Sequence, residues 1–369
     1  MSVTVKIQEI QNRCVPRGNH ETPLCTSVET MISLRRVATP MKASTAMALR
    51  QKTSLAGKHF MCISQLSNAE LKGLIQHALD MKAAWRHNPE SARRAAPLMG
   101  QSMAMIFQKR STRTRVSTET GMFMLGGTGL MLGPSDIQLG ANESLEDTSK
   151  VLCRFNNIIL ARVFGHSDVV ELAKHSSVPV INALSDKYHP LQTLADLMTL
   201  REHFGPRGLK GKTLSWVGDG NNVLHDLMIG SIKSGMNVSV ATPLDYRPDA
   251  EIMAQAEELA KINGVVLKVT ADPLEATKGA HVVVTDTWVS MGQEEEGKKR
   301  KKDFAGYQVN DTMMANADPS AVFLHCLPRK PEEVSDSVFY SAKSLVFPEA
   351  ENRMWTVMAV TLELLGKRW

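Results

Sequence analysis

The sequence predicts an α/β protein in which two doubly wound parallel-sheet domains enclose an active site in the cleft between them. Short apolar runs typical of buried strands alternate with helical segments from about residue 55 onward. This order favours parallel sheets with helices on both faces and ligands at the carboxyl ends of the strands. The loop Gly205-Pro206-Arg207-Gly208 divides the alternation into two halves. A length of 369 residues also agrees with about two domains.

The first half opens with a helix. Ser67 and Glu70 form a capping box, and apolar residues at helical spacing continue to about Trp85. After Pro190 a second long helix is expected to run to about Glu202. The other elements predicted here are strands over 102–107, 157–161 and 178–181 and helices over 112–125, 143–154 and 169–175.

The second half repeats the pattern. Its predicted elements are strands over 213–217, 238–241, 265–269, 282–285 and 321–325 and helices over 223–234 and 249–263. The run 294–303 is dense in both charge signs, which is typical of a solvated loop or helix face. A last helix, over 353–365, is expected to pack back across the first domain. We therefore expect one domain over 55–188, with the C-terminal helix 350–369 added to it, and another over 206–345.

Composition argues against several classes of protein. Hydrophobic residues make up 43% and charged residues 22%, as in ordinary globular chains. A net charge of +5 is too small to indicate a nucleic-acid partner. The longest apolar runs are far shorter than the ~20 residues that cross a bilayer, so no stable membrane association is expected. The cysteines lack metal-binding spacing, which predicts free thiols in a reducing compartment. They are Cys14, Cys25, Cys62, Cys153 and Cys326.

The segment 1–54 is interpreted as a leader, a transit peptide for the mitochondrion. Residues 31–58 hold six basic residues and no Asp or Glu, a composition typical of such peptides. Residues 1–30 fit less well because they carry Glu9, Glu21 and Glu29. A translation start at Met1 and one at Met31 both remain open. The alternative is an untargeted disordered tail.

The densest chemical signal lies where a predicted strand ends and a helix begins. The stretch from Phe107 to Arg115 reads FQKRSTRTR. Hydroxyls, free backbone N–H groups and guanidinium groups meet there, which favours a phosphate. The Walker frame is missing, so this is not a P-loop. The alternative is that the cations merely cover a surface.

Four ordered motifs resemble those of the aspartate and ornithine carbamoyltransferase family. The first two, Ser111-Thr112-Arg113-Thr114-Arg115 and His189-Pro190-Leu191-Gln192, look like its carbamoyl-phosphate motifs. The others, Asp286-Thr287-Trp288-Val289-Ser290-Met291-Gly292 and His325-Cys326-Leu327-Pro328, resemble the motifs that separate ornithine enzymes from aspartate enzymes. The similarity runs from about Leu55 to Trp355 and is strongest to the vertebrate mitochondrial branch.

The resemblance implies a reaction and an assembly. Carbamoyl phosphate and L-ornithine would give L-citrulline and phosphate, as in arginine biosynthesis and the urea cycle. The first domain would bind carbamoyl phosphate and the second ornithine, in that order, and the loop at Ser290 would close. The family also implies a homotrimer in the mitochondrial matrix and a reaction without metal or organic cofactor.

Carried over residue by residue, the resemblance also assigns the carbamoyl-phosphate site. The phosphate would be held by Ser111, Thr112, Arg113, Thr114 and Gln192. The carbonyl oxygen would be stabilised by Thr114, Arg162 and His189, with Arg353 as a further cation. Taken alone, Arg162 could be a surface cation, His189 a structural histidine, and Arg353 a cap or a partner of Glu349 or Glu351.

By the same resemblance, Asn222, Asp286, Ser290, Met291, Cys326 and Leu327 would bind ornithine. An anionic Asp286 suits a cationic substrate. Cys326 could accept the proton of the δ-amine or stabilise the neutral amine near the Leu327 carbonyl. A core cysteine is the alternative. The catalytic residues expected are thus Cys326, Arg162, His189 and Asp286.

Two departures from the family pattern leave other functions open. Gln108 replaces a glutamate that could orient neighbouring arginines, so restoring Glu is expected to raise activity. Thr128 replaces a histidine that reaches the adjacent subunit. A weakly active or non-catalytic family member is therefore one alternative. An NAD-dependent dehydrogenase is another, because Gly218-Asp219-Gly220 follows a strand, although Val223 stands where a third glycine is needed.

Overall fold

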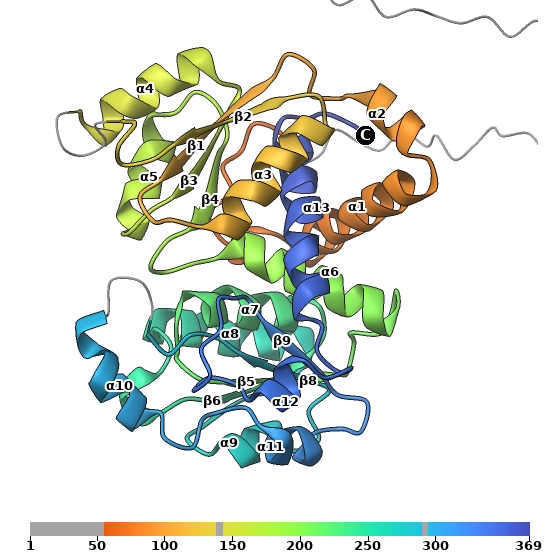
Figure 1. The fold of residues 1–369 in the computed structure, drawn as a ribbon, viewed down its shortest axis with the longest axis vertical. Coiled ribbons are helices and arrows are strands. Elements are labelled where there is room, and N and C mark those ends of the chain that lie inside the picture. The colour runs from red at the N-terminus through yellow and green to blue at the C-terminus, as the bar shows by residue number, and fades with distance from the viewer. Residues whose placement is uncertain (1–54, 138–142, 290–293) are drawn as a thin grey trace, which may run out of the picture. The chain divides into compact units, whose positions relative to one another are not determined.

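The computed structural model describes residues 55–137, 143–289 and 294–369, and two parallel β-sheets organise them (Figure 1). The first sheet has the strand order β2-β1-β3-β4. Its strands are β1 (Ser102–Phe107), β2 (Thr128–Leu132), β3 (Ile158–Arg162) and β4 (Val180–Leu184). The second sheet has the order β7-β6-β5-β8-β9. Its strands are β5 (Thr213–Val217), β6 (Asn237–Ala241), β7 (Leu267–Thr270), β8 (Val282–Thr285) and β9 (Val322–His325). Every pairing in both sheets is parallel, which confirms the predicted fold class.

Helices cover both faces of each sheet, as parallel strands require. The first sheet and its surroundings, here called the first lobe, contain α1 (Asn68–His87), α2 (Pro89–Ala95), α3 (Thr112–Met124), α4 (Leu145–Phe155) and α5 (His166–His175). The second lobe, around the second sheet, contains α7 (Asn222–Lys233), α8 (Ala250–Asn263), α9 (Pro273–Thr277), α10 (Gly297–Asp303), α11 (Asp311–Asn316) and α12 (Asp336–Phe339). Single 3-10 turns are η1 (Ile63–Gln65), η2 (Leu244–Tyr246) and η3 (Glu294–Glu296).

Two helices connect the lobes. In Figure 1, α6 (Pro190–Phe204) runs between the sheets, where it packs against β4 and α7. The chain leaves β9 in the second lobe and enters α13 (Val346–Leu364), which packs against α1, α3 and α6. The C-terminal helix therefore returns to the first lobe and carries side chains past the end of β9.

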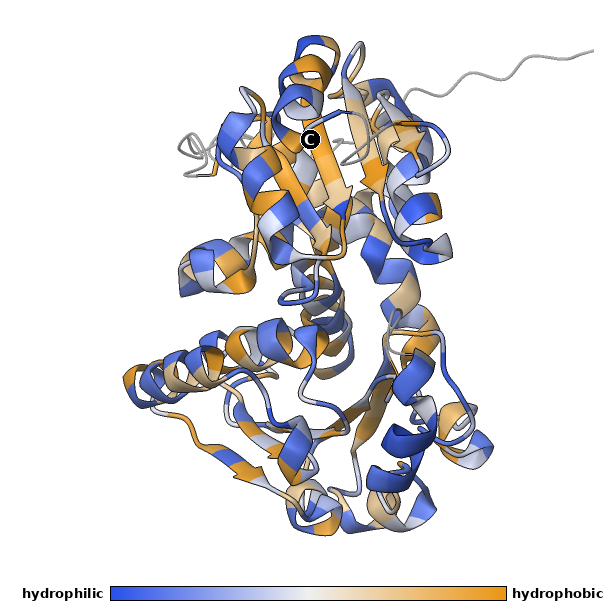
Figure 2. Ribbon diagram, turned by 90° about the vertical axis from the view of Figure 1, so that its left-hand side faces the viewer, coloured by the Kyte–Doolittle hydropathy of each residue, from blue (hydrophilic) through white to orange (hydrophobic). Residues whose placement is uncertain are grey.

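Local sequence explains the element boundaries. The predicted capping box starts α1: the Glu70 N–H donates to Ser67 Oγ at 3.2 Å, and the Ser67 N–H donates to Glu70 Oε2 at 2.8 Å. The predicted strands 102–107, 213–217 and 282–285 are confirmed with the same ends. These strands are mostly apolar and buried, although Ser215 interrupts β5. Figure 2 colours the strands of the first lobe as hydrophobic. The edge strand β2 was not predicted.

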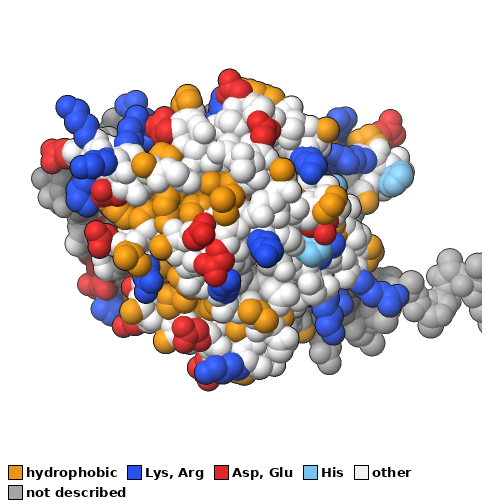
Figure 3. All heavy atoms as spheres, turned by 90° about the horizontal axis from the view of Figure 1, so that it is seen from below, with side chains coloured by type: hydrophobic (Ala, Val, Ile, Leu, Met, Phe, Trp, Pro, Cys, Tyr) orange, Lys and Arg blue, Asp and Glu red, His pale blue; other side chains and the backbone are white. Residues whose placement is uncertain are grey.

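The surface agrees with the composition. Acidic and basic side chains are interspersed over the face of the second lobe in Figure 3, so this face has no continuous basic surface for nucleic acid. None of the helices in the described ranges is long and apolar enough to span a bilayer. Cys62, Cys153 and Cys326 are free thiols, as predicted. The leader 1–54, with Cys14, Cys25 and both candidate starts, lies outside the described residues.

Candidate functional site

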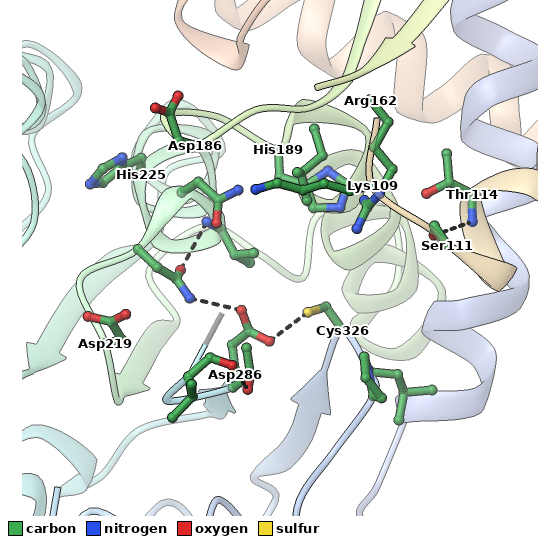
Figure 4. A pocket seen from close by; sticks show the side chains of 18 of the residues that line it. Lys109, Ser111, Thr114, Arg162, Asp186, His189, Asp219, His225, Asp286 and Cys326 are labelled. Carbon is green, nitrogen blue, oxygen red and sulfur yellow. Dashed lines mark hydrogen bonds between the residues drawn. The ribbon is translucent and has the colours of Figure 1, made fainter. Parts of the chain in front are cut away.

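A pocket of about 1060 Å³ lies between the two lobes, at the carboxyl ends of the strands (Figure 4). This is the place predicted for ligands of doubly wound sheets. Most of the site residues expected from sequence line it. They are Ser111, Thr112, Arg113, Thr114, Arg162, His189, Asn222, Asp286, Cys326, Leu327 and Arg353. Ser290 and Met291 lie outside the described residues.

The corner between β1 and α3 forms one wall. Ser111 is the N-cap of α3, and its hydroxyl accepts the Thr114 N–H at 3.2 Å. The remaining N–H groups of the first turn and the positive end of the helix dipole make this corner suitable for an anion. Lys109 and Arg110 line the same wall. Three of the four cations of this stretch, Lys109, Arg110 and Arg113, therefore line the pocket, whereas Arg115 is exposed and pairs with Glu119.

Arg353 reaches this corner from α13. Its Nη1 donates to Gln192 Oε1 at 2.6 Å and its Nη2 donates to Thr114 Oγ1 at 3.1 Å. Burial, followed by the charge of Arg113, lowers the pKa of Arg353 to about 10, so it stays cationic at neutral pH. Glu351 pairs instead with Lys82 and Arg86, so it is not the partner of Arg353.

Gln192 lies behind Arg353 and does not line the pocket. Its amide donates to Asp196 at 2.8 Å and to Glu349 at 2.7 Å. Burial raises the pKa of Asp196 to about 7 and the pKa of Glu349 well above its usual range. The two carboxyl groups thus share a buried site in which a proton is retained. In this structure Gln192 anchors Arg353.

His189 and Arg162 form the deepest part of the wall and are both buried. Burial and then Arg353 hold the pKa of His189 well below its usual range, so the imidazole is neutral. Burial and the neighbouring Arg353 and Arg113 lower the pKa of Arg162 to about 10. Among the described residues, neither His189 Nδ1 nor Arg162 Nε has a hydrogen-bond partner. Unpaired buried polar atoms of this kind are suited to a polar ligand.

Arg113 crosses from the first lobe to the second. Its Nη2 donates to the carbonyl oxygen of Leu327, which follows β9. The contact brings the anion-binding corner next to the motif His325-Cys326-Leu327-Pro328. A ligand that engages Arg113 would therefore be adjacent to Cys326.

An acidic group faces this corner from the second lobe. The Cys326 thiol donates to Asp286 Oδ1 at 2.9 Å, and Asn221 Nδ2 donates to Asp286 Oδ2 at 2.9 Å (Figure 4). Burial, with Asp286 next in importance, raises the pKa of the Cys326 thiol well above its usual range. The thiol is therefore protonated at neutral pH. The geometry favours Cys326 as a hydrogen-bond donor over the expected proton acceptor.

The two asparagines that begin α7 have different tasks. Asn221 is the N-cap and accepts the N–H groups of Val223 and Leu224 as well as holding Asp286. Asn222 donates to the carbonyl of Ser185 at 2.6 Å. The sequence indicated only Asn222 as a site residue. Sequence alone does not show which of two adjacent asparagines caps the helix and which one contacts a distant residue.

Arg300 is a pocket residue that the sequence analysis missed. The run 294–303 was interpreted as solvated, yet Arg300 is only 7% exposed. Its guanidinium donates to Asp219 Oδ2 and to the Trp288 carbonyl, both at 2.9 Å. Burial raises the pKa of Asp219 to about 6, although Arg300 opposes the shift. In the sequence, Arg300 is one of several consecutive basic residues, and no signal separates it from its exposed neighbours.

The loop Gly218-Asp219-Gly220, which suggested a dinucleotide site, is explained by contacts within the protein. Asp219 is committed to Arg300. A Cβ on Gly220 would lie 2.3 Å from the Pro248 nitrogen, so backbone packing requires this glycine. Gly218 has a φ of +150°, and a Cβ there would lie 3.3 Å from Thr285 Oγ1, so both glycines that suggested a dehydrogenase have a structural explanation.

Within the described ranges, two groups of side chains have the donor types that bind metals. Asp286, His325 and Cys326 place ligand atoms within 4.8 Å of one another. His325 Nδ1, however, accepts the Leu327 N–H, and His325 Nε2 bonds to Glu333, so both ring nitrogens are occupied. The second group, Glu146, Glu171 and His175, lies on α4 and α5 outside the pocket. Both groups are held by protein contacts.

Comparison with known proteins identifies the relatives of this chain. The family model "Aspartate/ornithine carbamoyltransferase, carbamoyl-P binding domain" matches residues 58–202, and "Aspartate/ornithine carbamoyltransferase, Asp/Orn binding domain" matches residues 210–364. Mitochondrial ornithine carbamoyltransferase of Aquarana catesbeiana is 52% identical over 85% of this chain and 88% of its own length. Mitochondrial ornithine transcarbamylase of Gallus gallus is 52% identical over 84% and 86%.

Solved structures agree with these relatives. Ornithine carbamoyltransferase from Pyrococcus furiosus superposes with a TM-score of 0.80 at 44% identity, over 85% of this chain and 98% of that one. A mitochondrial ornithine carbamoyltransferase from Coccidioides immitis gives 0.77 at 44% identity, over 84% and 98%. Two matching domain models, a shared fold and the pocket between the lobes lead to one conclusion: the chain belongs to the aspartate/ornithine carbamoyltransferase family.

Proposed function

We propose that this chain is an ornithine carbamoyltransferase, which converts carbamoyl phosphate and L-ornithine into L-citrulline and phosphate. The observation that carries the proposal is the pocket itself. It places the hydroxyl and guanidinium groups of the β1–α3 corner opposite the carboxylate of Asp286. A dianion and an amino acid with a terminal amine fit these two walls.

Carbamoyl phosphate would bind to the first wall. The Ser111 and Thr112 hydroxyls, the backbone N–H groups of the first turn of α3, and Arg113 would hold the phosphate. Arg353 would stabilise its charge while it remains anchored by Gln192 and Thr114. Arg113 would exchange the Leu327 carbonyl for the phosphate, which frees that carbonyl for ornithine.

The chemical step is an attack by the δ-amine on the carbamoyl carbon. A C–N bond forms, the C–O bond to phosphate breaks, and the amine proton leaves with the phosphate. Arg162, neutral His189 and the Thr114 hydroxyl would donate hydrogen bonds to the carbonyl oxygen as negative charge develops on it. Losing one such donor should cost about 100-fold or more in turnover.

Ornithine would bind to the second wall. Asp286 would hold its α-ammonium group, Asn222 its carboxylate, and the Cys326 thiol would lie near the δ-amine. Ser290 and Met291 would complete this end. An aspartate-specific site needs additional positive charge at this end, so the carboxylate of Asp286 explains a preference for a cationic substrate.

A citrulline assay with the purified chain tests the function. Citrulline formation that requires both substrates is expected. No product at saturating carbamoyl phosphate and ornithine would contradict the proposal and favour the non-catalytic alternative. Activity that persists after treatment with a chelator is expected if no metal takes part. Binding of carbamoyl phosphate in the absence of ornithine, but not the reverse, would support the proposed order.

Homotrimer formation is also proposed. Large apolar side chains are exposed on the outer elements of the first lobe, where Phe123 on α3 is 80% exposed, Phe155 on α4 is 74% exposed and Leu130 on β2 is 46% exposed. Such a surface is typical of an interface between subunits. Light scattering after size-exclusion chromatography should give three times the mass of one chain, and a monomer that retains full activity would contradict this.

We propose further that the chain works in the mitochondrial matrix. The two vertebrate relatives are named mitochondrial, and residues 31–58 have a transit-peptide composition. Import assays of chains begun at Met1 and at Met31 test this. Retention of both in the cytosol would contradict it.

A further inference from the structure

The side chain of Gln108 joins two loops that line the pocket. Gln108 follows β1 directly, and its backbone N–H donates to the Arg162 carbonyl at 2.9 Å. Its side-chain carbonyl accepts the Phe164 N–H at 2.6 Å, and its side-chain amide donates to Asp168 Oδ2 at 3.1 Å. Both ends of one amide are therefore used: one bonds Phe164 in the β3–α5 connection, and the other bonds Asp168 in the first turn of α5.

The first of these contacts extends the sheet. In the parallel β1–β3 ladder, Phe107 pairs with Arg162. If the ladder continued, a backbone carbonyl of the β1 strand would accept the next N–H, that of Phe164. The Gln108 side chain supplies that carbonyl instead. On its other side β3 is irregular at the same level: the register of its pairing with β4 shifts between Ala161 and Arg162. Gln108 thus supports the end of β3 where the ladder is weakest.

The second contact fixes which atom of the amide faces which partner. Asp168 lies in the first turn of α5, where the helix dipole favours a negative charge. It needs a hydrogen-bond donor, and Phe164 N–H needs an acceptor. An amide satisfies both at once, whereas a carboxylate at position 108 satisfies only Phe164 and places a second negative charge beside Asp168. Lys109 holds the same loop, with its ammonium nitrogen 5.0 Å from the centre of the Phe164 ring.

We infer that Gln108 is a positioning residue that holds Arg162 toward the bound carbamoyl phosphate, and that this role requires one donor and one acceptor across the pair formed by residues 108 and 168. The inference rests on the proposed function. Arg162 is the last residue of β3, and the tied residue Phe164 is two positions further on. A glutamine at position 108 then satisfies both Phe164 and Asp168. We therefore expect Gln108→Glu to lower activity, whereas the sequence alone predicted that it would raise it.

Three variants with unchanged Lys109 test the inference. Gln108→Glu should raise the KM for carbamoyl phosphate roughly tenfold, because a charge-related hydrogen bond is lost. Asp168→Asn is the matched control: its amide oxygen can still accept from Gln108, so the KM should stay within about threefold of the parent. Gln108→Glu combined with Asp168→Asn exchanges donor and acceptor at constant net charge and should restore the KM to within about threefold.

The measurements separate positioning from loss of fold. A merely structural defect lowers kcat through loss of active enzyme and leaves the KM for carbamoyl phosphate unchanged. Melting temperatures and the dissociation constant of phosphonoacetamide, a stable mimic of carbamoyl phosphate, are measured alongside. The inference would be overturned if Gln108→Glu bound carbamoyl phosphate and phosphonoacetamide as tightly as the parent or more tightly. It would also be overturned if the double variant bound them as weakly as Gln108→Glu does. If Gln108→Glu does not fold, the double variant must fold and bind the mimic; its failure overturns the inference as well.

The same experiment distinguishes the two proposals. A parent chain that forms no citrulline contradicts the proposed function, whatever the variants do. A parent chain that forms citrulline, together with variants that bind phosphonoacetamide equally, contradicts only the role of Gln108.

Discussion

Replacing Arg353 by lysine tests how the phosphate wall works. Arg353 is 3% exposed and uses two nitrogens of one planar group to bond Gln192 on α6 and Thr114 on α3. Lysine keeps the positive charge but has a single nitrogen on a flexible chain, so it cannot bridge both acceptors in the same geometry. The substitution therefore separates charge from geometry.

The size of the effect follows from the bond that is lost. A hydrogen bond that involves a charged group is worth about 1.5–3 kcal/mol. With about 1.4 kcal/mol for each factor of ten, this corresponds to a ~10- to 150-fold weaker binding of carbamoyl phosphate. The loss should be largest in binding, since Arg353 would contact the phosphate before and after transfer.

The assay is the KM for carbamoyl phosphate together with the dissociation constant of phosphonoacetamide. Arg93→Lys is the matched control, because Arg93 is exposed on α2 and does not line the pocket. This control should leave both constants unchanged. An Arg353→Lys enzyme with the parent constants would show that charge alone holds the phosphate and would refute the geometric argument.

Three further predictions concern the second lobe. Asp219→Asn removes the buried carboxylate that pairs with Arg300 and leaves only the exposed Glu296 as its ion-pair partner, so the free energy of unfolding measured in urea should fall by about 3 kcal/mol; no loss would refute the importance of the pair. Burial raises the pKa of Asp226 to about 8, above ~3.9 for an unfolded chain. The folded protein therefore keeps this proton between about pH 4 and 8, and stability falls as the pH rises through that window, by up to ~1.4 kcal/mol per unit. Asp226→Asn should remove this slope, and a slope that persists would contradict the assignment. Asp286→Asn should raise the KM for ornithine by about 100-fold and leave that for carbamoyl phosphate unchanged; an equal change in both would argue against separate walls.

Sequence patterns predicted the parts of the fold that depend on local order. Buried strands such as β1 and β8 are continuous apolar runs, and α1 begins at a capping box whose partners are three residues apart. Strand β2 was missed because it lies at the sheet edge, is partly exposed and contains Gly129. An edge strand lacks the buried pattern that identifies a central one.

The site was predictable where a motif is contiguous and unpredictable where a partner is distant. The corner from Ser111 to Thr114 is one segment, so its chemistry could be recognised. Gln108 and Asp168 are 60 residues apart, and Arg300 and Asp219 are 81 residues apart. Spacing in the chain carries no information about such pairs, and only the parallel sheets bring them together.

The most direct test is a crystal structure with a bisubstrate mimic that joins a phosphonate to ornithine. The phosphonate should lie within hydrogen-bond distance of Ser111, Arg113 and the first turn of α3, with the α-ammonium group at Asp286. A phosphonate bound away from Arg113, or an amino-acid end bound in the first lobe, would contradict the proposed arrangement of the two substrates.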